Sequence, residues 1–133
     1  MTQGFLLPLI GLWALSFAGY AAAGLLMWRR RIHRTVHILL TVGAFLLDIV
    51  ALALINIHMM QVGRSIMDVP IGLRGAHNTI TNTSIGAYCV VAVLGFSRTV
   101  GWHKLGRWHV PAALTFLGVW IAARVCDWLV LSV

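Results

Sequence analysis

Histidines are the residues of this sequence that most readily carry chemistry. The chain holds six of them among few other polar groups, and all fall at the ends of apolar runs: His33, His37, His58, His77, His103 and His109. Imidazole nitrogens bind haem iron and first-row metal ions, and two imidazoles on facing elements suffice for a bis-histidine haem b. The pattern predicts a cofactor or metal centre, because the sequence offers no nucleophile with a base, no phosphate-binding loop and no paired carboxylates.

The apolar composition determines which elements must position these histidines. Of the 133 residues, 60% are hydrophobic and 10% are charged, and the mean hydropathy is +0.91, whereas soluble domains are about one quarter charged. These values exclude a water-soluble globule. A run of about 20 apolar residues spans a bilayer, and it must be helical because lipid satisfies no backbone hydrogen bonds. Four runs have this character, at residues 5–28, 36–57, 80–97 and 110–131.

The four runs predict an all-α, integral membrane, up-down four-helix bundle that forms a single transmembrane domain over residues 1–133. In the first run, Ala14, Ala18 and Ala22 form a stripe of small residues that would let a neighbouring helix approach closely. Alanine is also common in membrane helices for no particular reason, so the stripe carries no function.

Basic residues indicate the orientation in the membrane. The chain has 10 Lys and Arg against 3 acidic residues, which alone could suggest nucleic-acid binding, but the cations cluster at the ends of the apolar runs. Seven of the ten lie in two connections: Arg29, Arg30, Arg31, Arg34, Arg98, Lys104 and Arg107. The positive-inside regularity then puts these connections in the cytoplasm and both termini outside. We expect a multi-pass protein of the inner bacterial membrane with no nucleic-acid partner.

This orientation sorts the histidines into two groups, each drawn from two helices. Four candidate haem b ligands lie at the cytoplasmic edge: His33, His37, His103 and His109. At the outer edge His58 and His77, with the thioether of Met59, form a candidate metal site, and this ligand set selects copper(I). A histidine at a membrane edge can also be a plain polar cap, and His103 and His109 are the first candidates for that role.

Charged residues inside the apolar runs form a second candidate site. Asp48 and Arg124 lie at similar depths in the second and fourth runs, and charges at mid-bilayer are costly unless paired, which predicts an Asp48–Arg124 ion pair. Asp127 follows Arg124 by three residues and shares its helix face. Arg124 could anchor a haem propionate and Asp48 could pass protons; alternatively, the cluster only fixes the register of the bundle.

Three segments resemble the YozB-like family of four-helix bacterial membrane proteins, whose function is unassigned and whose members often accompany cytochrome oxidase machinery. The segments are RIHRTVHILL, GAHNTITNTSIGAY and HKLGRWHVPAALTFLGVW. The resemblance implies that the family's characteristic residues match His33, His58, His77, His103, Arg107 and Pro111 of this chain. His37 and His109 stand where the family pattern has a methionine and a small hydroxyl residue, which favours a haem here that relatives lack. The outline is also similar to that of four-helix b-type cytochromes.

These features together favour a membrane electron-transfer subunit, a b-type cytochrome that carries electrons rather than a stand-alone enzyme. Its expected partners are membrane lipid, a larger membrane protein complex, and a periplasmic cytochrome or quinone for electron exchange. One alternative is an assembly or copper-handling protein of a respiratory oxidase that uses His58, Met59 and His77. A second alternative is a scaffold subunit of a larger complex, in which the histidines are only interface groups.

Overall fold

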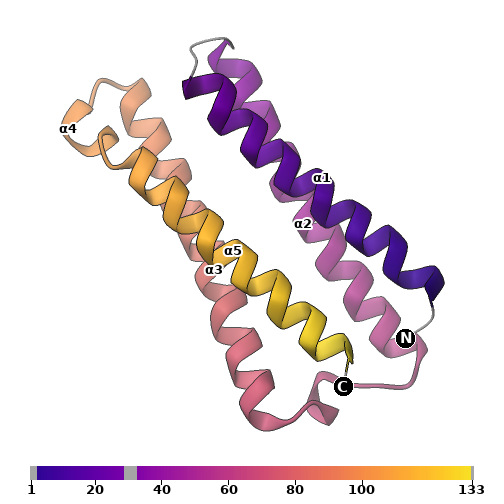
Figure 1. Ribbon diagram of the computed structural model, residues 1–133. Coiled ribbons are helices and arrows are strands. Elements are labelled where there is room, and N and C mark those ends of the chain that lie inside the picture. Colours follow the sequence, from indigo (N-terminus) through magenta and orange to yellow (C-terminus); the bar gives the residue numbers. More distant parts are fainter. Residues whose placement is uncertain (1–2, 29–32, 133) are drawn as a thin grey trace. The chain divides into compact units, whose positions relative to one another are not determined.

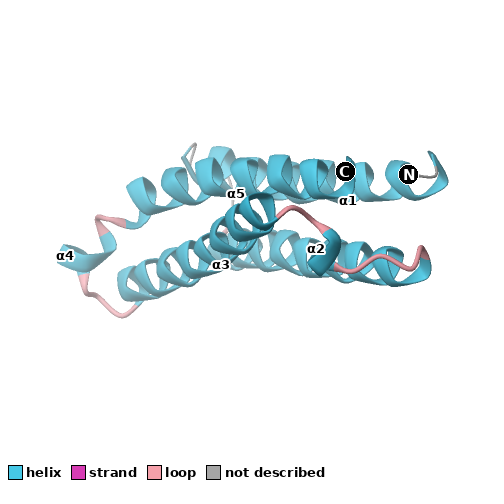
Figure 2. Ribbon diagram, turned by 90° about the horizontal axis from the view of Figure 1, so that it is seen from below, coloured by secondary structure: helices cyan, strands magenta, loops and turns pink. Residues whose placement is uncertain are grey.

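Every regular element that the structure describes is helical (Figures 1 and 2). The computed structural model describes residues 3–28 and 33–132. Its elements are α1 (Gln3–Trp28), α2 (Arg34–Gln61), the 3-10 helix η1 (Ile66–Asp68), α3 (Ile71–Thr99), the short α4 (His103–Gly106) and α5 (His109–Ser132). Four segments are long and apolar enough to cross a membrane, namely Phe5–Leu26, Arg34–Gln61, Ile71–Thr99 and His103–Ser132. The predicted all-α class with four membrane-length helices is thereby confirmed.

The helices pack in two units. The first unit ends at Ser65 and holds α1 against α2, and the second begins at Ile66 and holds α3 against α5, with α4 next to α3. Within each unit the two long helices run antiparallel and form a hairpin (Figure 1). Assembly of the two hairpins into one bundle and one domain stays a prediction. Arg29, Arg30 and Arg31, on which the predicted orientation partly depends, lie outside the described residues.

Small residues bring α1 and α2 together in the first unit. The Ser16 hydroxyl donates to the Ala44 carbonyl at 2.8 Å, and a Cβ added at Gly19 would lie 3.0 Å from the Ala44 Cβ. Such close backbone approach is a main source of association between membrane helices. The predicted alanine stripe does not make this contact, since Ala14 and Ala18 are exposed.

The start of α3 differs from the one that hydropathy predicts. The helix begins at Ile71, although the apolar run begins only near residue 80. Pro70 precedes the first helical residue, and proline suits a helix start because its φ is already fixed and no N–H is lost there. The polar stretch that follows stays helical because its hydroxyls can bond to carbonyls of the same helix, as Thr83 does to Thr79 at 2.7 Å.

Glycine ends both α2 and α3. Gly63 and Gly101 have φ values of +67° and +85°, in the left-handed region that favours glycine. After Gly101 the chain turns back on itself, so that the Trp102 N–H bonds to the Ser97 carbonyl at 2.9 Å. This bond is typical of a glycine-terminated helix end, and it fixes the direction in which the chain leaves α3.

Candidate cofactor ligands and buried charges

His37 and His109 occupy corresponding places in the two hairpins. His37 lies in the first turn of α2, and its Nδ1 is 3.2 Å from the carbonyl oxygen of Ala23 in α1. His109 is the first residue of α5, and its Nδ1 is 3.0 Å from the carbonyl oxygen of Val91 in α3. Both contacts are partly buried, so each ring crosses from one helix of its hairpin to the other.

The hydrogen-bond partner of each ring determines its tautomer. A carbonyl oxygen only accepts hydrogen bonds, so Nδ1 must carry the proton in both histidines. The lone pair of the neutral ring is then on Nε2. Metal-ligating histidines are commonly fixed in this way, with one ring N–H donated to a carbonyl so that the other nitrogen can bind the metal. The geometry of His37 and His109 therefore fits a haem or metal ligand at Nε2.

Gly95 makes room for the His109 ring on α3. A Cβ added at Gly95 would lie 3.0 Å from Cε1 and 3.3 Å from Nδ1 of His109, so the ring lies directly against the helix. Val91 and Gly95 are four residues apart, which puts the accepting carbonyl and the open space on one face of α3. In the sequence Gly95 resembles any small residue of a membrane helix, and sequence reasoning missed it because only the packing gives it a role.

A cluster of ionisable side chains is buried in the second hairpin, formed by His77 of α3 with Arg124 and Asp127 of α5. Asp127 is 1% exposed, and its carboxylate oxygens lie 3.2 Å from His77 Nδ1 and 3.1 Å from Arg124 Nη1. These are ion-pair distances, although the N–H groups are not aligned for hydrogen bonds. The Arg124 guanidinium also lies over the Trp120 ring, 5.6 Å from its centroid. One carboxylate therefore serves two basic side chains.

The buried carboxylate of the first hairpin has a different partner. Asp48 of α2 is 5% exposed, and Tyr20 of α1 donates its hydroxyl hydrogen to Asp48 Oδ2 at 2.9 Å. Sequence reasoning missed Tyr20, because a tyrosine in an apolar run gives no sign of its acceptor. The predicted Asp48–Arg124 ion pair joins residues of the two units and stays a prediction.

The other predicted ligands have different surroundings. His58 is buried, and its ring lies face to face with that of Phe5, with 3.9 Å between the centroids and 7° between the planes. Met59, the next residue, is also buried. His33 is exposed and caps the N-terminus of α2, and His103 is exposed at the start of α4. The predicted cytoplasmic-edge group thus divides into two oriented histidines and two exposed ones.

Arg124 lies far from the oriented histidine of its own helix. It follows His109 by 15 residues, which is about 22 Å along α5. A haem propionate in contact with Arg124 would therefore belong to a haem at the far end of α5 from His109.

No family model, curated protein or solved structure matches the chain. Within residues 3–28 and 33–132, no group of three or more His, Cys, Asp or Glu side chains is arranged to hold a metal ion. Axial ligation of a haem needs only two protein ligands, so His37 and His109 are the candidate axial ligands of this chain.

Proposed function

We propose that the protein is an electron-transfer subunit of the inner bacterial membrane that binds b-type haem, and that His37 and His109 each supply an axial ligand to haem iron. The observation that carries this assignment is shared by both hairpins: a histidine Nδ1 lies within hydrogen-bond distance of a carbonyl on the partner helix, at 3.2 Å and 3.0 Å. That bond assigns the lone pair to Nε2, the nitrogen that would coordinate iron. A bound haem would supply reversible one-electron chemistry.

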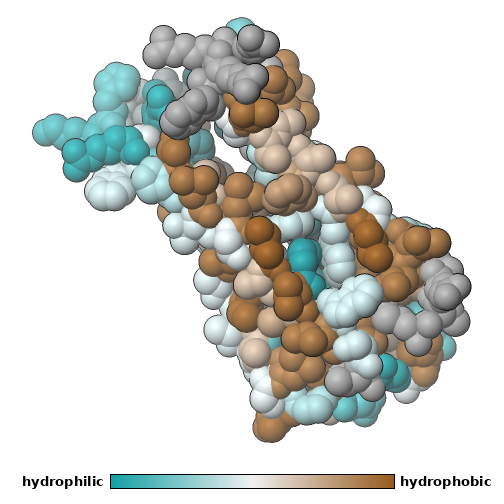
Figure 3. Space-filling model, in the orientation of Figure 1, coloured by the Kyte–Doolittle hydropathy of each residue, from teal (hydrophilic) through white to brown (hydrophobic). Residues whose placement is uncertain are grey.

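The surface of the hairpins supports insertion into a membrane. Large apolar side chains are exposed along every long helix, and many of them are brown on the face shown in Figure 3. Those with more than half of their surface exposed include Leu7, Leu15, Leu39, Val93, Phe96, Leu114 and Val125. Leaving such a side chain in water costs about 1.5 to 3 kcal/mol, whereas lipid covers it without that cost.

The backbone acceptors also prepare the ligands in advance. Ala23 and Val91 lie inside α1 and α3, so their carbonyls are held by the helices and do not depend on a bound cofactor. Each ring is therefore already oriented, and little side-chain entropy remains to be lost when Nε2 binds. A subunit that must hold a cofactor in one geometry while electrons pass benefits from such rigid ligands.

A pyridine haemochrome spectrum of the purified protein tests the proposal. We expect it to identify a b-type haem, and we expect the absorption spectrum of the native protein to show a low-spin, six-coordinate iron. His37→Ala and His109→Ala should each convert it to a high-spin form or release the haem. The matched controls are His33→Ala and His103→Ala, because both remove an exposed histidine near the same helix starts and should keep the wild-type spectrum.

Two results would contradict the assignment. One is a preparation made with excess haem that shows no Soret band. The other is a set of variants in which His33→Ala and His103→Ala change the spectrum while His37→Ala and His109→Ala do not. Circular dichroism of all four variants separates loss of a ligand from loss of the helices.

Copper handling through His58, Met59 and His77 has less support. One face of the His58 ring is covered by Phe5, and the Met59 side chain is 6% exposed. Elemental analysis of the same preparations distinguishes the two functions. Copper without haem, lost on His58→Ala, would favour the copper function.

A further inference from the structure

The turn from α3 to α5 concentrates positive charge that no acidic residue of the hairpin balances. Its basic side chains, all exposed, lie within residues 98–107: Arg98, His103, Lys104 and Arg107. The nearest acidic residues in the sequence are Asp68 and Asp127, which belong to the opposite end of this hairpin. Figure 3 shows hydrophilic residues gathered around α4. Within its own hairpin the turn therefore has no acidic partner, so an anionic ligand would balance its charge.

Backbone contacts hold the turn in one shape. Gly101 directs the chain so that the Trp102 N–H reaches the Ser97 carbonyl at 2.9 Å, and the Gly106 N–H bonds to the Trp102 carbonyl at 2.9 Å. The Arg98 side chain packs directly on Gly106, where a Cβ would overlap with it. The backbone that carries these cations is therefore already ordered, which lowers the entropy lost when a ligand binds.

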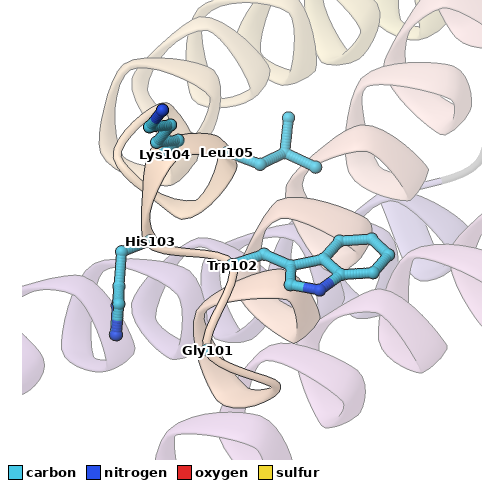
Figure 4. A pocket seen from close by; sticks show the side chains of 5 residues that line it. All are labelled: Gly101, Trp102, His103, Lys104 and Leu105. Atoms are coloured by element: carbon cyan, nitrogen blue, oxygen red, sulfur yellow. The ribbon is translucent and has the colours of Figure 1, made fainter.

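The turn also carries an open hollow. Gly101, Trp102, His103, Lys104 and Leu105 line about 490 Å³ of space (Figure 4). In this view the Trp102 indole and the Leu105 side chain extend to the same side, while the side chains of His103 and Lys104 point away from them. Trp102 is 66% exposed and Leu105 is 42% exposed, so the turn has an apolar side in addition to the side that carries His103 and Lys104.

We propose that this turn binds an anionic phospholipid, with Lys104 and Arg107 at the phosphodiester and with Trp102 and Leu105 against the glycerol and the first acyl methylenes. The proposal rests on the membrane insertion of the proposed function and is independent of the haem. Lys104 and Arg107 are three residues apart, which puts their side chains on one side of a helical turn. Basic pockets at the ends of membrane helices bind anionic headgroups, and indole rings favour the same depth.

The joint presence of charge and apolar surface favours a lipid over a soluble phosphate. A soluble phosphate would contact only the cations and would leave the Trp102 indole in water. A phospholipid is amphiphilic, so it covers the indole and leucine while it neutralises Lys104 and Arg107. The Arg107 guanidinium lies 5.5 Å from the centroid of the Trp108 ring, which is consistent with a cation held at the membrane interface.

Lipid retention by the full chain tests the proposal. The protein is reconstituted in nanodiscs of phosphatidylcholine with or without phosphatidylglycerol, extracted, and analysed by native mass spectrometry. We expect the wild type to retain phosphatidylglycerol in preference to phosphatidylcholine, and added salt to weaken that preference. The double variant K104Q/R107Q should lower the retention of phosphatidylglycerol on the order of tenfold or more, since a cation near an anionic surface contributes about 1 kcal/mol.

A matched control removes the same charge elsewhere. R64Q/R74Q neutralises two arginines that flank η1, in the connection between α2 and α3 and in the first turn of α3. This variant should retain phosphatidylglycerol as the wild type does. Trp102→Ala should lower retention, whereas Trp128→Ala in α5 should not. These variants change exposed or half-exposed side chains, and circular dichroism checks that each one is folded.

Several outcomes overturn the proposal. Equal loss of phosphatidylglycerol in the two double variants would mean that only net charge matters. A wild type that shows no preference for phosphatidylglycerol would mean that the turn is not a binding site for anionic lipid. Displacement of the lipid by inorganic phosphate alone would indicate a simple ion site. Failure of the chain to enter either nanodisc would contradict the proposed membrane function, whereas an inserted, haem-loaded protein without lipid preference would contradict this inference alone.

Discussion

The two hairpins share one feature and differ in another. In each, a histidine next to the connection donates from Nδ1 to a backbone carbonyl of the partner helix. Their buried carboxylates differ: Asp48 accepts from the hydroxyl of Tyr20, whereas Asp127 lies between His77 and Arg124. The shared geometry fits ligands of one kind of cofactor. Within its own hairpin Asp127 therefore faces two basic side chains, whereas Asp48 accepts a hydrogen bond from a neutral donor.

This difference has an energetic consequence. A buried carboxylate that loses a hydroxyl donor loses one charge-assisted hydrogen bond, whereas removal of a carboxylate shared by two basic side chains takes the countercharge from both, which is more costly. Loss of the Asp127 carboxylate should therefore lower the free energy of unfolding more than loss of the Tyr20 hydroxyl does. Three substitutions test this contrast and the shared histidine geometry.

The largest effect is expected for Asp127→Asn. It removes the carboxylate that faces the buried Arg124 and the partly buried His77, and breaking a buried pair in this way lowers the free energy of unfolding by about 3 to 5 kcal/mol. Unfolding in mixed micelles, followed by circular dichroism, measures the loss. Asp68→Asn removes an exposed carboxylate and serves as the control. If both variants lose the same stability, the contrast between the hairpins is refuted.

A smaller effect is expected for Tyr20→Phe. It removes one hydrogen bond to a carboxylate, which contributes about 1.5 to 3 kcal/mol, and keeps the aromatic ring in place. The same unfolding measurement applies, and Ser132→Ala, which removes an exposed hydroxyl bonded within its own helix, is the control. A loss for Tyr20→Phe as large as that for Asp127→Asn would show that the neutral donor matters as much as the charges.

The smallest effect on stability is expected for Gly95→Ala, which probes the shared geometry. The added methyl group would crowd the His109 ring at 3.0 Å, and overpacking of this kind costs about 1 to 3 kcal/mol, offset by about 1 kcal/mol of helix propensity. Gly86→Ala in the same helix meets nothing within 4 Å and is the control. We expect only Gly95→Ala to alter the haem spectrum, and identical spectra for the two variants would argue against His109 as a ligand.

Much of the fold could be predicted from the sequence because hydropathy is a local property. The run at residues 36–57 lies within α2, which extends from Arg34 to Gln61. The prediction was least accurate for α3, whose polar first turns escape an apolar window although their hydroxyls bond within the helix. Helix ends that depend on Pro70, Gly63 and Gly101 have recognisable residues but no apolar signal.

The candidate site was less predictable. All the histidines stood out in the sequence, yet His109 next to Trp108 could equally have been an interface residue, and the structure instead holds it against Val91. The carbonyls that orient His37 and His109 are backbone atoms, which every residue possesses. No side-chain pattern could therefore distinguish the oriented histidines from the exposed His33 and His103.

The sequence by itself determined the number, length and class of the helices and the residue types available for chemistry, since apolar run length and side-chain identity are read without knowing any neighbour. Only the tertiary structure decided which imidazole nitrogen carries a proton and which basic groups share Asp127. These contacts form where polar atoms of two packed helices come within about 3 Å of each other. Rotation of either helix about its axis by a fraction of a turn would remove them.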